Sequence, residues 1–246
     1  MARLIGKVAL VTGGSRGIGA AIAKRLAADG ADIALTYANS PAKADAVVAE
    51  IEALGRKAVA LAADSADARA VIGAVEGTVG ALGRIDILVN NAGIFIGGSL
   101  DNDTLEDIDQ TLAVNVRAVY VGSQAAARHM RKGGRIISIG SCLAEFVGDP
   151  GKTLYSMSKA ALVGMTKGMA RDLGPRGITV NIVHPGPTDT DMNPAAGERA
   201  DGQRARLAVG HYGKTADIAA AVAYLAGEDT GFVTGTSLAV DGGFAA

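Results

Sequence analysis

Four residues whose side chains could together reduce a carbonyl group lie between positions 115 and 159. Tyr155 and Lys159 are four residues apart in a helical run, which places both on one helix face, about one turn apart. A phenol can donate the proton that a ketone oxygen needs, and a nearby ammonium helps by lowering the phenol pKa from its usual value of about 10. We therefore expect Tyr155 to be the proton donor, with Lys159 tuning its pKa.

Ser141 and Asn115 complete this set. Ser141 follows a strand-like apolar run and can hydrogen-bond the carbonyl oxygen and orient it. Asn115 lies in a long helical run, where its side chain or a local helix break can seat a water that resupplies the proton. A carbonyl reduction also needs a hydride donor, so the chain should bind a nicotinamide nucleotide, whose ribose Lys159 could hold.

A glycine-rich turn near the N-terminus has the form of a dinucleotide site. Residues 12–19 read Thr-Gly-Gly-Ser-Arg-Gly-Ile-Gly, between an expected strand and an expected helix. Glycines let backbone N–H groups approach a pyrophosphate, and the helix N-terminus adds partial positive charge. The alternative is a glycine-rich turn without a ligand. The expected contacts are Gly13, Ser15, Arg16, Gly17, Ile18 and Gly19.

The nucleotide that the sequence favours is NADP(H). The second expected strand ends in Tyr37, with Asn39 and Ser40 after it, and lacks the acidic residue that usually binds the ribose of NAD. Arg16, with Asn39 and Ser40, could hold a 2′-phosphate that a carboxylate would repel. The alternative is that Arg16 is a solvated turn residue.

Further nucleotide contacts are expected after the third and fourth strands. Asp64, next to Ser65, could accept a hydrogen bond from the adenine amino group, or it could cap the next helix. Asn91, Ala92 and Gly93 form a small stretch that can pack under a cofactor, although alone it indicates only a turn.

Short apolar runs alternate with longer amphipathic ones along the chain. The short runs are nearly continuous in Val, Ile, Leu and Ala, which is typical of strands buried on both faces of a parallel sheet. The alternation predicts a doubly wound, Rossmann-type α/β fold of about seven strands, with helices on both faces and ligands at the carboxyl ends of the strands. The expected strands are residues 7–12, 32–37, 57–62, 85–90, 135–139, 178–183 and 237–240, and the expected helices are residues 18–28, 41–54, 67–82, 104–131, 153–173 and 215–225.

We expect residues 1–246 to form one domain, because no linker rich in Pro or Ser divides the chain. The 24 basic and 25 acidic residues give a net charge of −1, without the basic footprint of a nucleic-acid or membrane binder. No apolar stretch is long enough to span a membrane, and the start shows no signal region. One cysteine, Cys142, and three scattered histidines favour a cytoplasmic protein without a disulfide or a metal site.

Together these motifs resemble the short-chain dehydrogenase/reductase family in its single-domain branch, and most of all 3-oxoacyl-carrier-protein reductases and related bacterial carbonyl reductases. The resemblance implies that the four residues form a catalytic tetrad, and that Thr188 and Thr190 contact the nicotinamide amide. It also implies that the polar segment 188–214, which includes Arg199, is a substrate lid. The matching pieces are residues 12–19, Asp64, 90–93, Asn115, Ser141, Tyr155 with Lys159, Pro185 with Gly186 and Thr190, and 240–243.

The expected function is therefore NADPH-dependent reduction of a ketone, either a 3-oxoacyl thioester or a small carbonyl compound. The alternative is a nucleotide-binding regulatory protein on the same fold with little or incidental catalysis. Residues 142–154 hold one residue more than is common in the carrier-protein reductases and should line the substrate mouth. Lys132 and Arg176 fall near positions that such reductases use to dock an acyl carrier, although solvated surface roles would also fit.

A homotetramer is expected as well. The segment 234–246 is small, apolar and rich in glycine, and the helices expected at 104–131 and 153–173 carry wide apolar faces. Two-fold symmetry is the commonest way to bury such surfaces, and the branch that the chain resembles usually forms tetramers. We therefore expect one interface built from those helices and another from the C-terminal strand and tail. The alternative is a monomer whose tail folds back on its own lid.

We predict that NADPH supports reduction with a kcat/KM at least about tenfold higher than NADH does. The reason is that Arg16 is accompanied by no acidic residue at positions 37–40. Steady-state kinetics with each coenzyme and one ketone tests this, and an equal or better kcat/KM with NADH would reject it.

Overall fold

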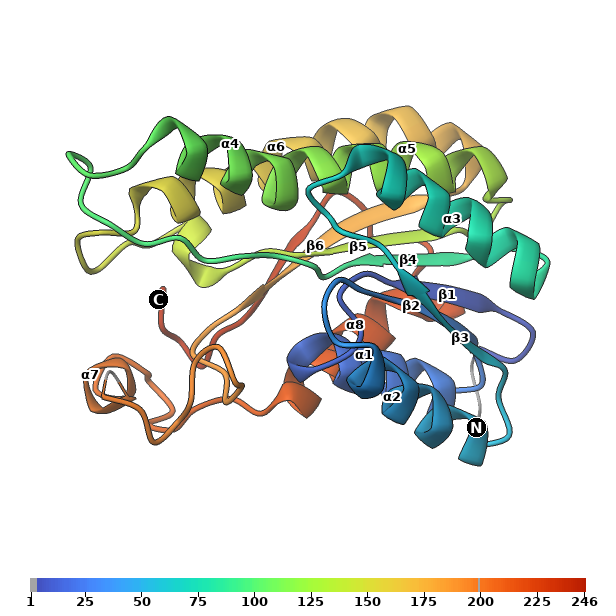
Figure 1. Cartoon of the computed structure of the whole chain (residues 1–246), viewed down its shortest axis with the longest axis horizontal. Helices are drawn as coiled ribbons and strands as arrows, with labels where there is room; N and C mark the ends of the chain where they lie inside the picture. The colour runs from blue at the N-terminus through green and yellow to red at the C-terminus, as the bar shows by residue number, and fades with distance from the viewer. Residues whose placement is uncertain (1–3, 199) are drawn as a thin grey trace.

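Seven parallel strands form one sheet in the order β3-β2-β1-β4-β5-β6-β7 (Figure 1). The computed structural model describes residues 4–198 and 200–246, so Arg199 of the expected lid and residues 1–3 lie outside the described residues. The doubly wound fold and all seven expected strands are confirmed. Their bounds are β1 (Val8–Val11), β2 (Asp32–Tyr37), β3 (Ala58–Ala62), β4 (Ile87–Asn90), β5 (Arg135–Ile139), β6 (Thr179–Pro185) and β7 (Ser237–Val240).

Helices cover both faces of this sheet. In Figure 1, α3, α4, α5 and α6 lie on one face, and α1, α2 and α8 lie on the other. A short helix, α7, lies apart from both layers. The bounds are α1 (Gly17–Ala28), α2 (Pro41–Ala53), α3 (Ala68–Leu82), α4 (Leu105–Leu112), α5 (Ala118–His129), α6 (Thr153–Leu173), α7 (Ala200–Arg204) and α8 (Thr215–Ala226).

The two helical layers bury separate hydrophobic clusters against the sheet. Successive residues of a strand point to opposite faces. In β1, Ala9 and Val11 accordingly belong to the cluster under α1 and α8, whereas Leu10 belongs to the cluster under α3 and α5. All three side chains are fully buried. Burial on both faces is why the strands read as unbroken apolar runs.

The strand order reverses between β1 and β4. After β3 the chain returns across β1 and β2 to add β4 on the other side, and β1 pairs in parallel with both β2 and β4. Such a reversal opens a crevice at the carboxyl ends of the two strands, which is where α/β sheets bind ligands. The glycine turn after β1 and the stretch after β4 both lie at this crevice.

The helix expected at 104–131 is not continuous α-helix. It consists of α4, a π-helical segment η1 (Ala113–Arg117) and α5, which ends at His129. Propensity does not mark a π-turn, because the same residue types serve in an α-helix. Asn115 lies at its centre.

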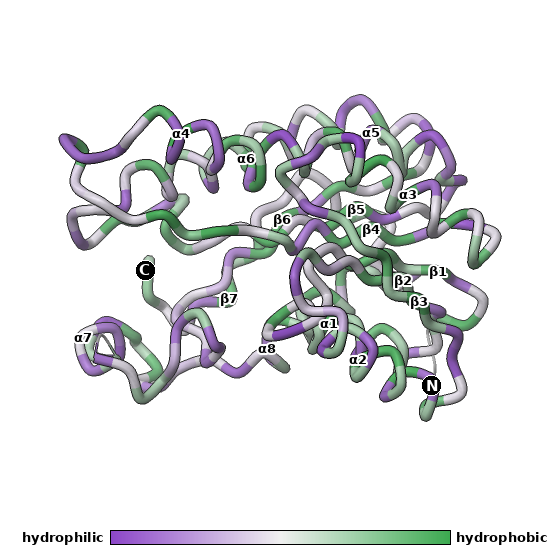
Figure 2. The backbone as a smooth tube through the Cα atoms, in the orientation of Figure 1, coloured by the Kyte–Doolittle hydropathy of each residue, from purple (hydrophilic) through white to green (hydrophobic). Residues whose placement is uncertain are grey.

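The segment expected to be a lid, 188–214 (hereafter the lid segment), packs against the C-terminal tail. A small cluster joins Cys142, Leu207, Tyr212 and Phe244, and the N–H of Val209 donates to the carbonyl of Gly242 at 3.2 Å. Phe244 of the tail is thus buried against this segment, whereas Ala239 of the edge strand β7 is exposed, so part of the apolar C-terminal surface is left uncovered in a single chain. Figure 2 shows that α7 itself is largely hydrophilic.

No helix within residues 4–198 and 200–246 combines the length and the apolar character that a bilayer crossing requires.

Candidate functional site

The turn after β1 depends on glycine at three positions. Gly13 and Gly17 have φ angles of +62° and +54°, a backbone region that side chains strongly disfavour. A Cβ at Gly19 would lie 2.3 Å from the carbonyl oxygen of Gly13 and 2.5 Å from Nδ2 of Asn91. The turn therefore closes on itself, as a cradle for a bound group must.

Side chains from two neighbouring strands hold this turn in place. Nδ2 of Asn91 donates to the carbonyls of Thr12 and Gly13, at 2.8 and 3.1 Å. Oγ1 of Thr12 accepts from the N–H groups of Asn91 and Ala92, both at 3.0 Å. From β2, Oγ1 of Thr36 accepts from the N–H of Gly13 at 2.9 Å. Asn91 and Ala92 thus brace the turn.

The N-terminus of α1 is open to an anion. No side chain caps it at Arg16, and its first turn contains no acidic residue. The first backbone N–H groups of a helix have no partner within the helix, so those of Gly17, Ile18 and Gly19 can serve a bound phosphate. With Ser15 at the start of this segment, the residues present fit the pyrophosphate of a dinucleotide.

The residues expected around the adenine ribose lie at the same edge. Tyr37 ends β2, and Asn39 and Ser40 precede α2, with Asn39 exposed and Ser40 partly so. Since β1 and β2 pair in parallel, these residues lie beside the turn that carries Arg16.

Asp64 does not cap α3. Its Oδ1 accepts from the N–H of Ala66 at 2.8 Å, whereas Asp67 caps the helix by accepting from the N–H of Arg69. The capping alternative for Asp64 is therefore wrong, and its contact with adenine stays a prediction. Ser65 lines a small cavity at the carboxyl end of β4.

Asn115 is fully buried, and its amide clamps a backbone segment. Oδ1 accepts from the N–H of Ile94 at 3.0 Å, and Nδ2 donates to the carbonyl of Ile94 and to Oγ of Ser158, each at 3.0 Å. A Cβ at Gly93 would lie 3.4 Å from Oδ1 of Asn115 and 3.3 Å from Nζ of Lys159. The bare backbone at Gly93 thus lies against two of the four expected catalytic side chains.

The hydroxyl of Ser141 is available as a hydrogen-bond donor toward the site. Its Oγ accepts from the N–H of Leu143 at 3.1 Å, which leaves the O–H to donate elsewhere. His184 of β6 holds the Ser141 backbone, with Nδ1 lying 2.8 Å from the carbonyl oxygen and 3.1 Å from the nitrogen. A Cβ at Gly140 would lie 2.5 Å from that Nδ1, so only glycine lets the ring approach. Burial lowers the pKa of His184.

Tyr155 and Lys159 lie on one face of α6, next to Ser141. Burial raises the pKa of the Tyr155 hydroxyl to about 12, although a hydrogen bond with the Ser141 side chain lowers it. Burial lowers the pKa of Lys159 to about 8, and Nζ donates to the carbonyl of Ile139 at 3.0 Å. Nζ approaches the face of the Tyr155 ring, 5.6 Å from its centre. The expected lowering of the phenol pKa is therefore not present in the chain itself.

The residues that follow β6 make most of their contacts with other parts of the protein. A Cβ at Gly186 would lie 2.6 Å from Cα of Asp241, so this turn after Pro185 needs glycine. Oγ1 of the buried Thr188 donates to the carbonyl of Gly186 at 2.9 Å. Thr190 lies near Gly17, with Cγ2 3.8 Å from where a Cβ would stand. The structure thus places Thr190 at the glycine turn, and the expected contacts of both threonines with the nicotinamide amide stay predictions.

Sequence reasoning missed several residues that position this site. The carbonyl of Tyr155 accepts from Oγ of Ser158 at 2.7 Å, which links Asn115 to the proton donor. Phe95 packs edge-on against Tyr155, with ring centres 5.0 Å apart. Ser158 could have been found, because it lies one helical turn after Tyr155. The other missed residues contact partners that are distant in the sequence, so no local pattern marks them. The missed residues are Thr36, Phe95, Ser158 and His184.

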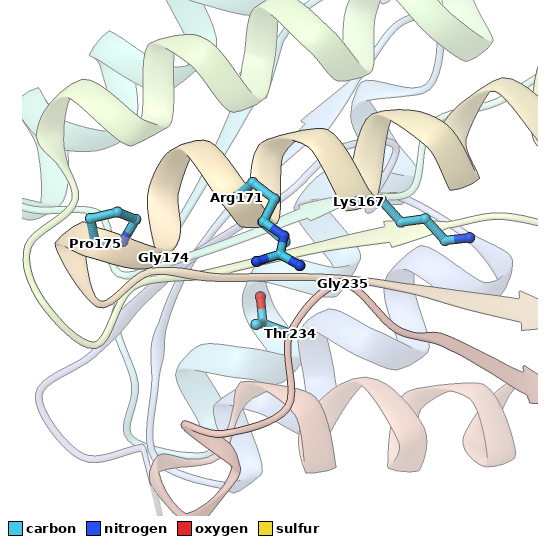
Figure 3. A pocket seen from close by; sticks show the side chains of 7 residues that line it. Lys167, Arg171, Gly174, Pro175, Thr234 and Gly235 are labelled. Carbon is cyan, nitrogen blue, oxygen red and sulfur yellow. The ribbon is translucent and has the colours of Figure 1, made fainter.

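Cys142 and a surface cavity beside α6 lie outside this chemistry. Burial raises the pKa of Cys142 to about 11, so it remains a thiol near neutral pH. A cavity of about 710 Å³ lies near the far end of α6 from Tyr155, beside Lys167, Arg171 and Thr234 (Figure 3). It contains none of the expected catalytic residues.

Comparisons with known proteins agree with this geometry. A family model described as enoyl-(acyl carrier protein) reductase matches residues 13–245. A short-chain dehydrogenase from Burkholderia cenocepacia, solved in complex with NADP, is 66% identical with a TM-score of 0.98, and the match covers 99% of this chain and 100% of that one.

Two curated relatives differ in their described roles. The cyclic-di-GMP-binding biofilm dispersal mediator protein of Escherichia coli is 44% identical over 246 residues, which is 100% of both chains. A 3-oxoacyl-[acyl-carrier-protein] reductase of Staphylococcus aureus is 40% identical over 240 residues, 96% of this chain and 97% of that protein. With its glycine turn, its Tyr155 and Lys159 pair and these matches, the chain belongs to the short-chain dehydrogenase/reductase family.

Proposed function

We propose that the protein is an NADPH-dependent reductase of small carbonyl compounds, with Tyr155 as the proton donor. The observation that carries this proposal is the convergence of the Tyr155 hydroxyl, the Ser141 side chain and the Lys159 ammonium at the carboxyl edge of the sheet. The NADP held by the Burkholderia cenocepacia relative supports NADP(H) as the cofactor. When bound, that cofactor supplies the hydride.

Ser141 and Tyr155 act on the carbonyl oxygen. The Ser141 hydroxyl can donate a hydrogen bond to this oxygen, because its contact with the N–H of Leu143 uses Oγ only as an acceptor. Tyr155, whose raised pKa keeps the phenol protonated at pH 7, gives its proton to the same oxygen as negative charge develops there. His184 fixes the Ser141 backbone and so helps to hold the Ser141 hydroxyl beside that of Tyr155.

Lys159 and Asn115 support the donor. With a pKa of about 8, Lys159 is mostly protonated at pH 7, and its charge favours the phenolate that remains after proton transfer. Asn115 holds Ile94 and, through Ser158, the backbone of Tyr155. The water that Asn115 was expected to seat for the return of the proton stays a prediction.

The substrate mouth favours a small apolar carbonyl compound over a carrier-bound thioester. Phe95 lies against Tyr155, and Phe146 packs edge-on against Phe244. The nearby cations Lys152 and Arg206 are both paired with Asp149, whose pKa they hold well below its usual range.

Arg176, one of the two cations that could dock an acyl carrier according to the sequence, is engaged by the chain itself. Its guanidinium donates to the carbonyls of Ala127 and Met130 at the end of α5. A capping role of this kind leaves little of Arg176 for an acidic partner.

A second candidate function is nucleotide-dependent regulation. One observation favours it: the Escherichia coli relative, matched over its whole length, is described as binding cyclic-di-GMP. The cavity beside Lys167 and Arg171 offers two exposed cations for a phosphodiester. Calorimetric titration with cyclic-di-GMP tests this candidate. Binding that Arg171→Gln abolishes, in a protein that reduces no ketone, would favour the regulator over the reductase.

The proposed assembly is a homotetramer with one interface on α4, α5 and α6 and another on β7 and the C-terminal tail. These helices leave large apolar side chains exposed, among them Leu105, Tyr120 and Met157. Light scattering at micromolar concentration should give a mass about four times the 24.6 kDa of the chain. A mass near that of one chain would reject the tetramer.

We predict that Tyr155→Phe lowers kcat for ketone reduction at least about a hundredfold while leaving the Kd for NADPH nearly unchanged. The ring still packs against Phe95, and only the proton donor is removed. Tyr120→Phe, at an exposed tyrosine of α5, is the matched control. Substantial turnover by Tyr155→Phe would show that another group donates the proton.

A stability measurement tests the burial of Lys159. Its folded-state pKa of about 8 lies below the ordinary 10.5, so between these values the unfolded chain binds more protons and the free energy of unfolding rises with pH. Below pH 8 the folded protein carries the full cost of burying the ammonium. Lys159→Met removes that cost.

We predict that Lys159→Met raises the free energy of unfolding by about 2 kcal/mol at pH 7, after allowing for the lost bond to Ile139, and that the gain fades between pH 8 and 10.5. Urea titrations without nucleotide measure this, with the exposed Lys167→Met as control. A variant less stable than wild type at pH 7 would contradict the predicted cost.

A further inference from the structure

Three charged side chains from separate parts of the chain meet beside the glycine turn. Arg16 precedes α1, Lys43 lies in the first turn of α2, and Asp191 lies in the lid segment. One oxygen of Asp191, Oδ2, is 3.8 Å from Nη1 of Arg16 and 3.5 Å from Nζ of Lys43. Two cations therefore converge on a single anionic oxygen.

These contacts can exchange for others. All three side chains are more than half exposed to solvent. Exposed ion pairs contribute only about 0–1 kcal/mol, because water solvates each partner nearly as well. Arg16 and Lys43 can therefore turn to another anion when one with more charge is present.

We propose that Lys43 shares the 2′-phosphate of NADP(H) with Arg16, and that Asp191 competes with this phosphate for both cations. The inference rests on the proposed placement of the 2′-phosphate beside Arg16. A phosphate monoester carries up to two charges and offers three oxygens, so it can satisfy two cations better than one carboxylate does. NAD(H) lacks this phosphate and leaves the Asp191 contacts intact.

The competition links the nucleotide to the lid. Asp191 belongs to a tight turn in which Thr190 and Asn193 exchange backbone hydrogen bonds, at 3.4 and 3.1 Å. Thr190 also lies near Gly17 at the start of α1. A phosphate that displaces Asp191 thus removes a charged tether between the lid and the nucleotide site, while the apolar cluster around Tyr212 remains.

Calorimetry with NADP⁺ and NAD⁺ on the full chain tests both parts. We expect Lys43→Gln to weaken NADP⁺ binding about tenfold, and Asp191→Asn to tighten it about threefold, with NAD⁺ affinity unchanged in each variant. Lys24→Gln is the matched control, since Lys24 is a partly exposed lysine that pairs with Glu50 at 3.0 Å, away from this cluster.

A double variant separates competition from a general effect of charge. If Asp191 acts by occupying the two cations, Asp191→Asn should gain much less NADP⁺ affinity in the Lys43→Gln background than in wild type. The gain should also shrink as salt is raised, since salt screens exposed charges. Equal tightening of NADP⁺ and NAD⁺ by Asp191→Asn would overturn the proposed competition.

Arg16→Gln tests the placement of the 2′-phosphate separately from the proposed roles of Lys43 and Asp191. If this variant binds NADP⁺ as tightly as wild type, the placement of the 2′-phosphate beside Arg16 is wrong. If it binds NADP⁺ more weakly while Lys43→Gln and Asp191→Asn match wild type, the placement holds and only the shared and competing contacts are wrong.

Discussion

The hydrogen bonds between Asn91 and the glycine turn hold the nucleotide site together. They join the carboxyl ends of β1 and β4, which are adjacent in the sheet but almost 80 residues apart in the chain. The turn cannot relax away from the strand, because Gly19 and Gly13 already approach each other and Asn91 too closely for any side chain. The short segment after β4 starts at this junction and brings the backbone of Gly93 against Lys159.

A second amide, that of Asn115, connects the segment after β4 to the helix that bears Tyr155 and Lys159. It binds Ile94, two residues past the Asn91 and Ala92 brace, and reaches Ser158 between Tyr155 and Lys159. The proton donor is thus connected to the nucleotide turn through the partly buried amide of Asn91 and the buried amide of Asn115. Such connected polar networks favour a single arrangement, because each unpaired buried group would cost about 1–3 kcal/mol.

Local patterns were enough to predict the strands and the glycine turn, and to single out four side chains that the structure brings close together, because each pattern depends on neighbours within a few positions. The catalytic roles of those four residues stay a prediction. The remaining features depend on distant partners. Thr36 reaches the turn only because β2 pairs with β1, and Asp191 meets Arg16 only because the lid returns to the nucleotide edge. The burial of Phe244 under the lid likewise reflects a contact that no window of the sequence contains.

The π-helical segment around Asn115 changes which side chains of α4 and α5 can face the rest of the protein at the same time. A π-turn contains one residue more than the α-turn it replaces, and one residue of α-helix corresponds to a rotation of about 100°. The register of α5 is therefore offset from that of α4. In this register Ser123 accepts a buried hydrogen bond from Asn90, while Asn115 points to Ile94. Removing one residue from the segment would force a choice between those two alignments.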